Sequence, residues 1–122
     1  SARRPAAVSR YSVFGMRPGT YREQVRRLFA ATARTLEAAG ATMADVVEIQ
    51  TFHANAKTSE AFAKELEEFL AVHKEHFPSA YPAWTAIGNA TLLAPGAVLE
   101  MRVMAVAGSG KNARVERKAA AS

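Results

Sequence analysis

The chain has 122 residues, of which 49% are apolar and 22% are charged, and it contains no cysteine. This composition is ordinary for one globular domain, and the absence of cysteine excludes disulfides, thiolate catalysis and cysteine-bound zinc. The sequence shows no run of about 18 apolar residues and no secretory signal pattern, so we expect a cytoplasmic protein without a membrane span.

The formal net charge is +5, and the excess of positive charge lies near the two ends of the chain. The charged residues outside positions 11–107 are Arg3, Arg4, Arg10, Lys111, Arg114, Arg117 and Lys118, with Glu116 as the acid among them. Terminal segments of this composition are typically solvated. We therefore expect a flexible basic arm over residues 1–10, one folded domain over residues 11–107 and a flexible basic tail over residues 108–122. Because the domain carries no basic excess, nucleic acid is an unlikely partner.

The first predicted elements are a strand and an amphipathic helix. Residues 11–16 are rich in aromatic and β-branched types, which favours a strand. Thr20 can cap the helix that follows, and Glu23 three residues later completes a capping box. Gly40 is suited to end that helix. Between these points, residues of one helical face recur at Val25, Leu28, Phe29, Thr32 and Leu36.

The rest of the chain predicts one more helix and three strands. Residues 45–53 alternate in polarity, as a half-buried strand does. Thr58 or Ser59 begins a helix, and strands follow over residues 84–93 and 97–107. One face of the second helix contains Phe62, Leu66, Phe69, Leu70, His73 and Phe77. The order strand, helix, strand, helix, strand, strand predicts the α+β class, as a two-layer sandwich with two helices on one face of a mixed sheet.

The last predicted strand is apolar on both faces. Its apolar positions are Leu99, Met101, Val103 and Ala105 on one face and Val98, Met104 and Val106 on the other. Glu100 and Arg102 interrupt the second face. A sheet that is covered by helices on one side should be polar on the other. We therefore expect the second face to contact another subunit.

Three stretches carry a family pattern. They are the helix end and strand start over residues 36–47, the stretch over residues 77–88 that contains Pro82-Ala83-Trp84-Thr85, and the closing strand over residues 95–107. Together they resemble the Rid family, also known as the YjgF-like or L-PSP endoribonuclease family. The resemblance implies a chorismate-mutase-like, YjgF-like fold, assembled as a homotrimer with small-metabolite pockets in the clefts between subunits. It also implies hydrolysis of reactive imines and enamines without a metal or an organic cofactor.

Trp84 stands where this family usually has an arginine that binds the substrate carboxylate. A guanidinium grips a carboxylate with two hydrogen bonds, whereas an indole offers one N–H and no charge. We therefore expect weak or no activity on classical 2-imino acids. At the residue level, Trp84 can equally be an aromatic side chain of the core or of a subunit interface.

Glu100 is the residue that the resemblance marks as catalytic, because it implies that Glu100 positions a water molecule or the imine. An ordinary surface charge beside Arg102 is the alternative, since the two side chains share one side of a strand. The resemblance implies a ligand cleft lined by Trp84, Tyr11, Phe14, Gly15 and Arg102.

Three functions follow from these observations. The first is a hydrolase (deaminase) that acts on a non-classical imine or enamine. The second is a non-catalytic trimer that binds a ligand or a protein partner and has lost deaminase activity; the missing arginine favours it. The third is RNA cleavage, which the older family name suggests and which we rank last, because no pair of histidines or lysines is placed for acid–base chemistry on a ribose.

The remaining motifs give little. His73 and His76 are three residues apart on one predicted helix, but no third ligand is near in the sequence, so no metal site is expected. His53 ends a predicted strand and could reach the cleft as a general base, with little to support it. The Gly108-Ser109-Gly110-Lys111 stretch lacks the other residues of a phosphate-binding loop and is interpreted as a linker.

Overall fold

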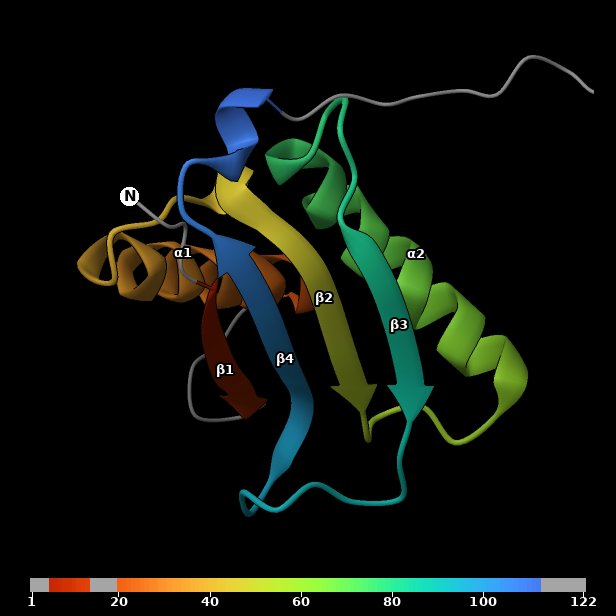
Figure 1. Ribbon diagram of the computed structural model, residues 1–122. Coiled ribbons are helices and arrows are strands. Elements are labelled where there is room, and N and C mark those ends of the chain that lie inside the picture. Colours follow the sequence, from red (N-terminus) through yellow and green to blue (C-terminus); the bar gives the residue numbers. More distant parts are fainter. Residues whose placement is uncertain (1–4, 14–19, 113–122) are drawn as a thin grey trace, which may run out of the picture.

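The computed structural model describes residues 5–13 and 20–112, in which two helices cover one face of a four-stranded sheet (Figure 1). The elements are β1 (Pro5–Val13), α1 (Tyr21–Ala38), β2 (Val46–His53), α2 (Ser59–His76), β3 (Ala83–Gly88) and β4 (Ala97–Val106). This confirms the predicted α+β class, the order of the elements and the two-layer sandwich. No helix in the described residues is long and apolar enough to cross a membrane.

The sheet is mixed in direction and has the strand order β1-β4-β2-β3. The central strand β4 runs antiparallel to both β1 and β2, and β3 runs parallel to β2. The parallel pair is possible because α2 carries the chain back between the two strands. In the described sheet, β1 and β3 are therefore the edge strands.

Both helices begin at threonine caps. The Thr20 hydroxyl accepts from the backbone N–H of Glu23 at 3.2 Å, and the Thr58 hydroxyl accepts from that of Ala61 at 3.1 Å. These bonds satisfy donors that a helix start leaves without partners. They confirm Thr20 as the first cap and show that Thr58 is the cap of the second helix.

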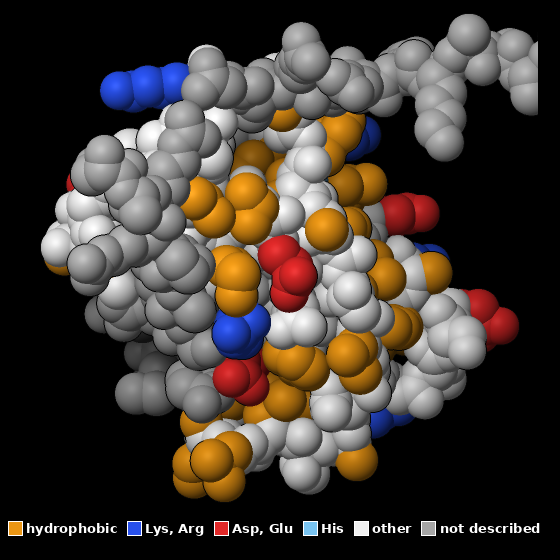
Figure 2. Space-filling view, in the orientation of Figure 1, with side chains coloured by type: hydrophobic (Ala, Val, Ile, Leu, Met, Phe, Trp, Pro, Cys, Tyr) orange, Lys and Arg blue, Asp and Glu red, His pale blue; other side chains and the backbone are white. Residues whose placement is uncertain are grey.

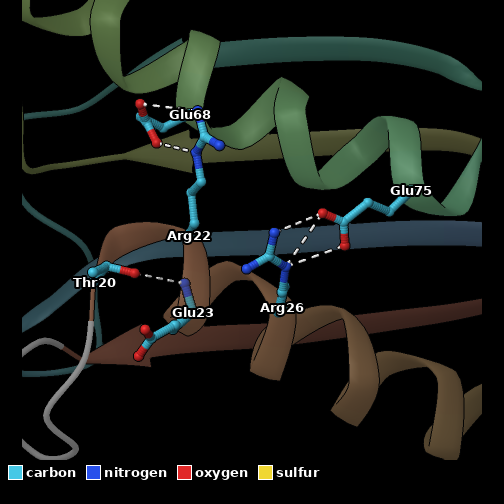
Figure 3. Close-up of polar contacts among 6 residues, drawn as sticks. All are labelled: Thr20, Arg22, Glu23, Arg26, Glu68 and Glu75. Carbon is cyan, nitrogen blue, oxygen red and sulfur yellow. Dashed lines mark hydrogen bonds and ion pairs between the residues drawn. The ribbon is translucent and has the colours of Figure 1, made fainter.

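Two ion pairs join the helices at the surface (Figure 3). Arg22 of α1 binds Glu68 of α2, and the Arg26 guanidinium lies 2.7 Å from the Glu75 carboxylate. All four side chains are about half exposed, so solvent screens these pairs and each adds little stability. They link α1 and α2 at the surface, and they do not replace the packing beneath.

The core lies between the helices and the sheet. All five residues of the stripe predicted for the first helix are buried. On α2, the predicted residues Phe69 and His73 are buried, but the stripe also includes Glu65 and Val72, which were not predicted. On β4, burial alternates as expected. Its buried residues are Ala97, Leu99, Met101, Val103 and Ala105.

Two strands have other bounds than predicted. The first strand covers Pro5–Val13 rather than residues 11–16, and its predicted residues beyond position 13 lie outside the described residues. Residues 5–10, expected in a flexible arm, pair with β4, which is long enough to place Pro5 opposite Val106. The third strand ends at Gly88 rather than Leu93, because its partner β2 ends at His53 and offers no further ladder.

The segment after β4 also differs from the prediction. Ser109–Asn112, expected in a flexible tail, form a short 3-10 turn. The backbone N–H of Gly110 donates to the Asp45 carboxylate at 2.8 Å, and Thr42 donates to the same carboxylate at 3.0 Å. Burial alone would raise the pKa of Asp45, but the hydrogen bonds from the backbone N–H groups of Gly110, Thr42 and Gly108 outweigh it and lower that pKa. The buried Asp45 therefore anchors the turn beside β2.

Gly110→Ala should lower the free energy of unfolding by about 1–3 kcal/mol. A Cβ atom at Gly110 would lie 2.4 Å from the carbonyl oxygen of Ala44, so either the turn or its bond to Asp45 must shift. Lys111→Ala, an exposed position of the same turn, is the matched control and should change this free energy by less than about 0.5 kcal/mol. Urea denaturation measures both variants. Equal stability of the two would show that the turn does not dock in solution.

Candidate functional site

The face of the sheet away from the helices has charged groups within apolar surroundings. Figure 2 views this face and shows hydrophobic side chains gathered over the strands, with a few charged groups among them. Glu100 of β4 is opposite Phe52 of β2, which in turn is opposite Ile87 of β3. Ile87 remains 39% exposed although it is apolar. The residues predicted for the second face of the last strand, Val98, Met104 and Val106, are half-buried in the single chain, and Val98 also packs against the core.

Glu100 and Arg102 are both half-buried on this open face. The Arg102 guanidinium lies 3.5 Å from the Gln50 side-chain oxygen, and no ion pair joins Arg102 to Glu100 in the described part of the chain. Tyr11 is paired in register with Glu100 across the β1–β4 ladder, so the backbones of these two residues lie side by side. Phe14 and Gly15 lie outside the described residues.

Trp84 lies on the other face of the sheet. It is opposite the fully buried Ile49, and its ring centroid lies 5.3 Å from that of Phe69 and 5.6 Å from that of His73, both on α2. Its indole N–H donates to the Thr51 hydroxyl at 3.0 Å. Within one chain, the structure does not bring Trp84 together with Glu100, because the sheet separates them.

A chain of buried polar groups continues from Trp84. The Thr51 hydroxyl lies 2.7 Å from Nε2 of His53, and Nδ1 of His53 lies 2.5 Å from the Glu65 carboxylate. The second Glu65 oxygen accepts from the Asn55 amide at 3.2 Å. Thr51, His53 and Glu65 are at most 7% exposed. A polar chain this well buried is stable only when its members satisfy one another.

The hydrogen bonds are satisfied when His53 is neutral. The Trp84 indole can only donate, so it uses a lone pair of the Thr51 hydroxyl, whose own proton is then available for Nε2 of His53. The remaining ring proton is on Nδ1 and points to Glu65. In this arrangement the His53 ring and the Asn55 amide, both hydrogen-bonded to Glu65, carry no charge.

Tyr21 lies beside this carboxylate at the start of α1. Burial raises the pKa of its hydroxyl, and the charge of Glu65 and a hydrogen bond to it raise that pKa further. Tyr21 therefore remains a neutral donor and does not add a second negative charge.

A pocket of about 340 Å³ opens beside Glu65, between the first turn of α1, the loop after β2 and the first turns of α2. This size is at the lower end for small-molecule sites. The pocket, hereafter the Glu65 pocket, is lined by Tyr21, Asn55, Ala56, Lys57, Ala61, Lys64, Glu65 and Glu68.

His73 is buried among aromatic rings at the end of α2. It is 3% exposed, and neither of its ring nitrogens has a hydrogen-bond partner in the described residues. Its ring centroid lies 4.8 Å from that of Phe77 and 6.4 Å from that of Tyr81. Burial, and then the charge of His76, lower the pKa of His73, so the folded protein holds it neutral.

The sequence contained signals for part of this polar chain. Thr51 and His53 follow the buried Ile49 at a spacing of two, which places them on the same face of the strand. Glu65 precedes Phe69 by one helical turn and so is a carboxylate on the buried stripe. Among the described residues, no three His, Asp or Glu side chains lie close enough together to hold a metal ion.

Comparison with known proteins shows a family match over most of the chain. Residues 12–107 match the family model described as Endoribonuclease L-PSP. The chain is 35% identical, over 86 residues, to RutC family protein YjgH of Escherichia coli K12. This match covers 70% of the chain and 60% of that relative, so the chain spans less than two thirds of the relative's length.

Solved structures show the same fold. The structure of protein YjgH has a TM-score of 0.64 at 28% identity, covering 83% of this chain and 76% of that one. Yeast Mmf1 has a TM-score of 0.64 at 26% identity, covering 75% of this chain and 66% of that one. A putative endoribonuclease of Thermotoga maritima has a TM-score of 0.67 at 21% identity, and the match covers 81% of this chain and 75% of that one.

The buried His73 predicts a loss of stability in mild acid. Because the pKa of His73 in the folded state lies below the ordinary 6.5, the unfolded chain takes up the proton first. Neutral His73 therefore stabilises the folded state fully above pH 6.5. This stabilisation decreases as the pH falls below that value. His73→Phe should therefore show a smaller drop in the free energy of unfolding between ~pH 7.5 and ~pH 5.5 than the wild type. His76→Gln is the control for the neighbouring histidine. An equal drop in wild type and His73→Phe would contradict the assignment.

Proposed function

The chain belongs to the endoribonuclease L-PSP family, and on that premise we propose that it forms a homotrimer that binds a small metabolite in clefts between subunits. The metabolite is an imine, an enamine or a related compound that the protein hydrolyses. In this proposal the open face of the sheet lines the cleft, and Glu100 positions the attacking water or the imine nitrogen.

The open face supports this proposal more than any other surface. It combines exposed apolar side chains, such as Ile87, with a carboxylate that has no ion-pair partner among the described residues. A second subunit laid on this face would bury the apolar groups and exclude water around Glu100. Exclusion of water strengthens the interaction of a carboxylate with a developing positive charge, such as a protonated imine.

Trp84 argues against a classical 2-imino acid as the substrate. Such a substrate has a carboxylate that must leave water, which costs several kcal/mol without a cationic partner. Trp84 is uncharged, and Thr51 already accepts its one N–H. Arg102, which binds Gln50 only weakly, is the cation nearest to Glu100 in the β4 sequence and is the candidate for contacting any anionic group of the ligand.

A non-catalytic trimer is the second candidate. The observation that favours it is the packing of Trp84 between α2 and Thr51. The family resemblance implies a substrate-binding arginine at this position, whereas here the position holds a side chain that packs against the core. In this case the same clefts bind a metabolite or a protein segment without turnover.

The oligomeric state in solution tests the assembly. We expect static light scattering to give three times the monomer mass, and Ile87→Glu to shift the mass toward the monomer, because the new charge would have to be buried in the interface. Leu93→Glu is the matched control, since Leu93 is 92% exposed outside the strands. It should leave the mass unchanged. A monomeric wild type at micromolar concentration would contradict both the trimer and the cleft.

Semicarbazide trapping of imines tests the chemistry. An amine oxidase supplies an imine without a carboxylate, and an amino-acid oxidase supplies 2-iminopropionate. We expect the wild type to accelerate hydrolysis of the first more than of the second, and Glu100→Gln to lower the first rate about 100-fold or more, because the amide cannot act as a base. The variant should remain trimeric. Rapid hydrolysis of 2-iminopropionate would contradict the role given to Trp84, and no acceleration of either imine would favour the non-catalytic trimer.

A further inference from the structure

We propose that the Glu65 pocket is a second ligand site, which takes a small zwitterion with one ammonium group and one carboxylate. It is separate from the clefts of the proposed function. The pocket lies on the helix-covered side of the sheet and is formed within one chain, whereas Glu100 lies on the open face.

The buried carboxylate of Glu65, at the floor of the pocket, favours a positively charged ligand group. Glu65 is 7% exposed and lines the pocket, where it is hydrogen-bonded to the His53 ring, the Asn55 amide and the Tyr21 hydroxyl. Within the described part of the chain, no lysine or arginine forms an ion pair with this buried carboxylate. A carboxylate has room for about four hydrogen bonds, so it can accept further ones from a ligand. An ammonium group would supply both the charge and the donors.

Two lysines at the rim of the pocket favour a negatively charged ligand group. Lys57 and Lys64 line the pocket, and neither forms an ion pair within the described part of the chain. The Lys57 ammonium donates to the backbone carbonyl of Ala54 at 3.2 Å, which holds it at the loop. The other rim carboxylate, Glu68, is paired with Arg22 (Figure 3). Two lysines are therefore available for a ligand carboxylate.

Both features together select one class of ligand. A simple amine would bind Glu65, but its positive charge would be repelled by the two lysines. A simple acid would bind the lysines, but its negative charge would be repelled by the buried Glu65 carboxylate. A zwitterion satisfies both ends. The Tyr21 hydroxyl, which donates to Glu65, also lines the pocket, and its oxygen can accept a hydrogen bond from the ammonium group of the ligand.

Titration calorimetry on the intact protein tests this inference. The probes are glycine, L-serine and 4-aminobutyrate as zwitterions of different length, with ethylamine, acetate and glycine betaine as controls. We expect saturable binding of at least one zwitterion, about 10-fold or more tighter than binding of ethylamine or acetate. Glycine betaine should not bind to a comparable degree, because its quaternary ammonium has no N–H to donate to Glu65.

Variants assign the site. Glu65→Gln and Lys64→Met should each weaken zwitterion binding about 10-fold or more, whereas Glu100→Gln should leave it unchanged. Lys74→Met, at an exposed position further along α2, is the control for the lost charge. If Glu65→Gln does not fold, Lys64→Met and Lys57→Met carry the test. The inference is overturned if no zwitterion binds, if acetate or ethylamine binds as tightly, or if binding depends on Glu100 instead.

Discussion

The contact between His53 and Glu65 is the interaction on which the polar interior depends. It joins the last residue of β2 to α2, and both side chains are at most 7% exposed, so the carboxylate is costly to bury unless it is well hydrogen-bonded. The Thr51 hydroxyl extends the contact to Trp84 of the edge strand β3. Displacing any of these elements would leave a buried polar group without its partner. The contact therefore fixes how α2, β2 and β3 are placed together.

The alternation of side chains along the strands then divides the chemistry between two faces. Thr51 and His53 point to the helices, while Gln50 and Phe52 point to the open face. The helix-covered face contains the hydrogen-bonded polar groups that run from Trp84 to Glu65, with the Glu65 pocket at their end. The open face contains Glu100 within apolar surroundings. Trp84 belongs to the first face. Trp84 is thus part of the packed layer under α2, where an uncharged ring suits its neighbours Phe69 and His73.

Local signals in the sequence predicted the local structure well. Thr20 and Thr58 cap their helices because short polar side chains reach the free N–H groups one turn ahead, and the α1 stripe is buried as its spacing indicates. The pairing of His53 with Glu65 could not be predicted, because twelve positions separate them and only the packing of α2 against β2 brings them together. The docked turn at Gly110 was missed for the same reason, since its partner Asp45 is remote in the sequence.

The protonation state of His53 is the most direct measure of this account. A long-range proton–nitrogen correlation spectrum at neutral pH, assigned with a His53→Gln variant, distinguishes the forms of the imidazole ring. We predict a neutral ring with its proton on Nδ1, directed to the Glu65 carboxylate, and a bare Nε2 that accepts from Thr51. A ring protonated on both nitrogens, or on Nε2 alone, would contradict it. Glu65 would then be neutralised by an imidazolium or lack its donor, and the charge ascribed to the pocket would be lost.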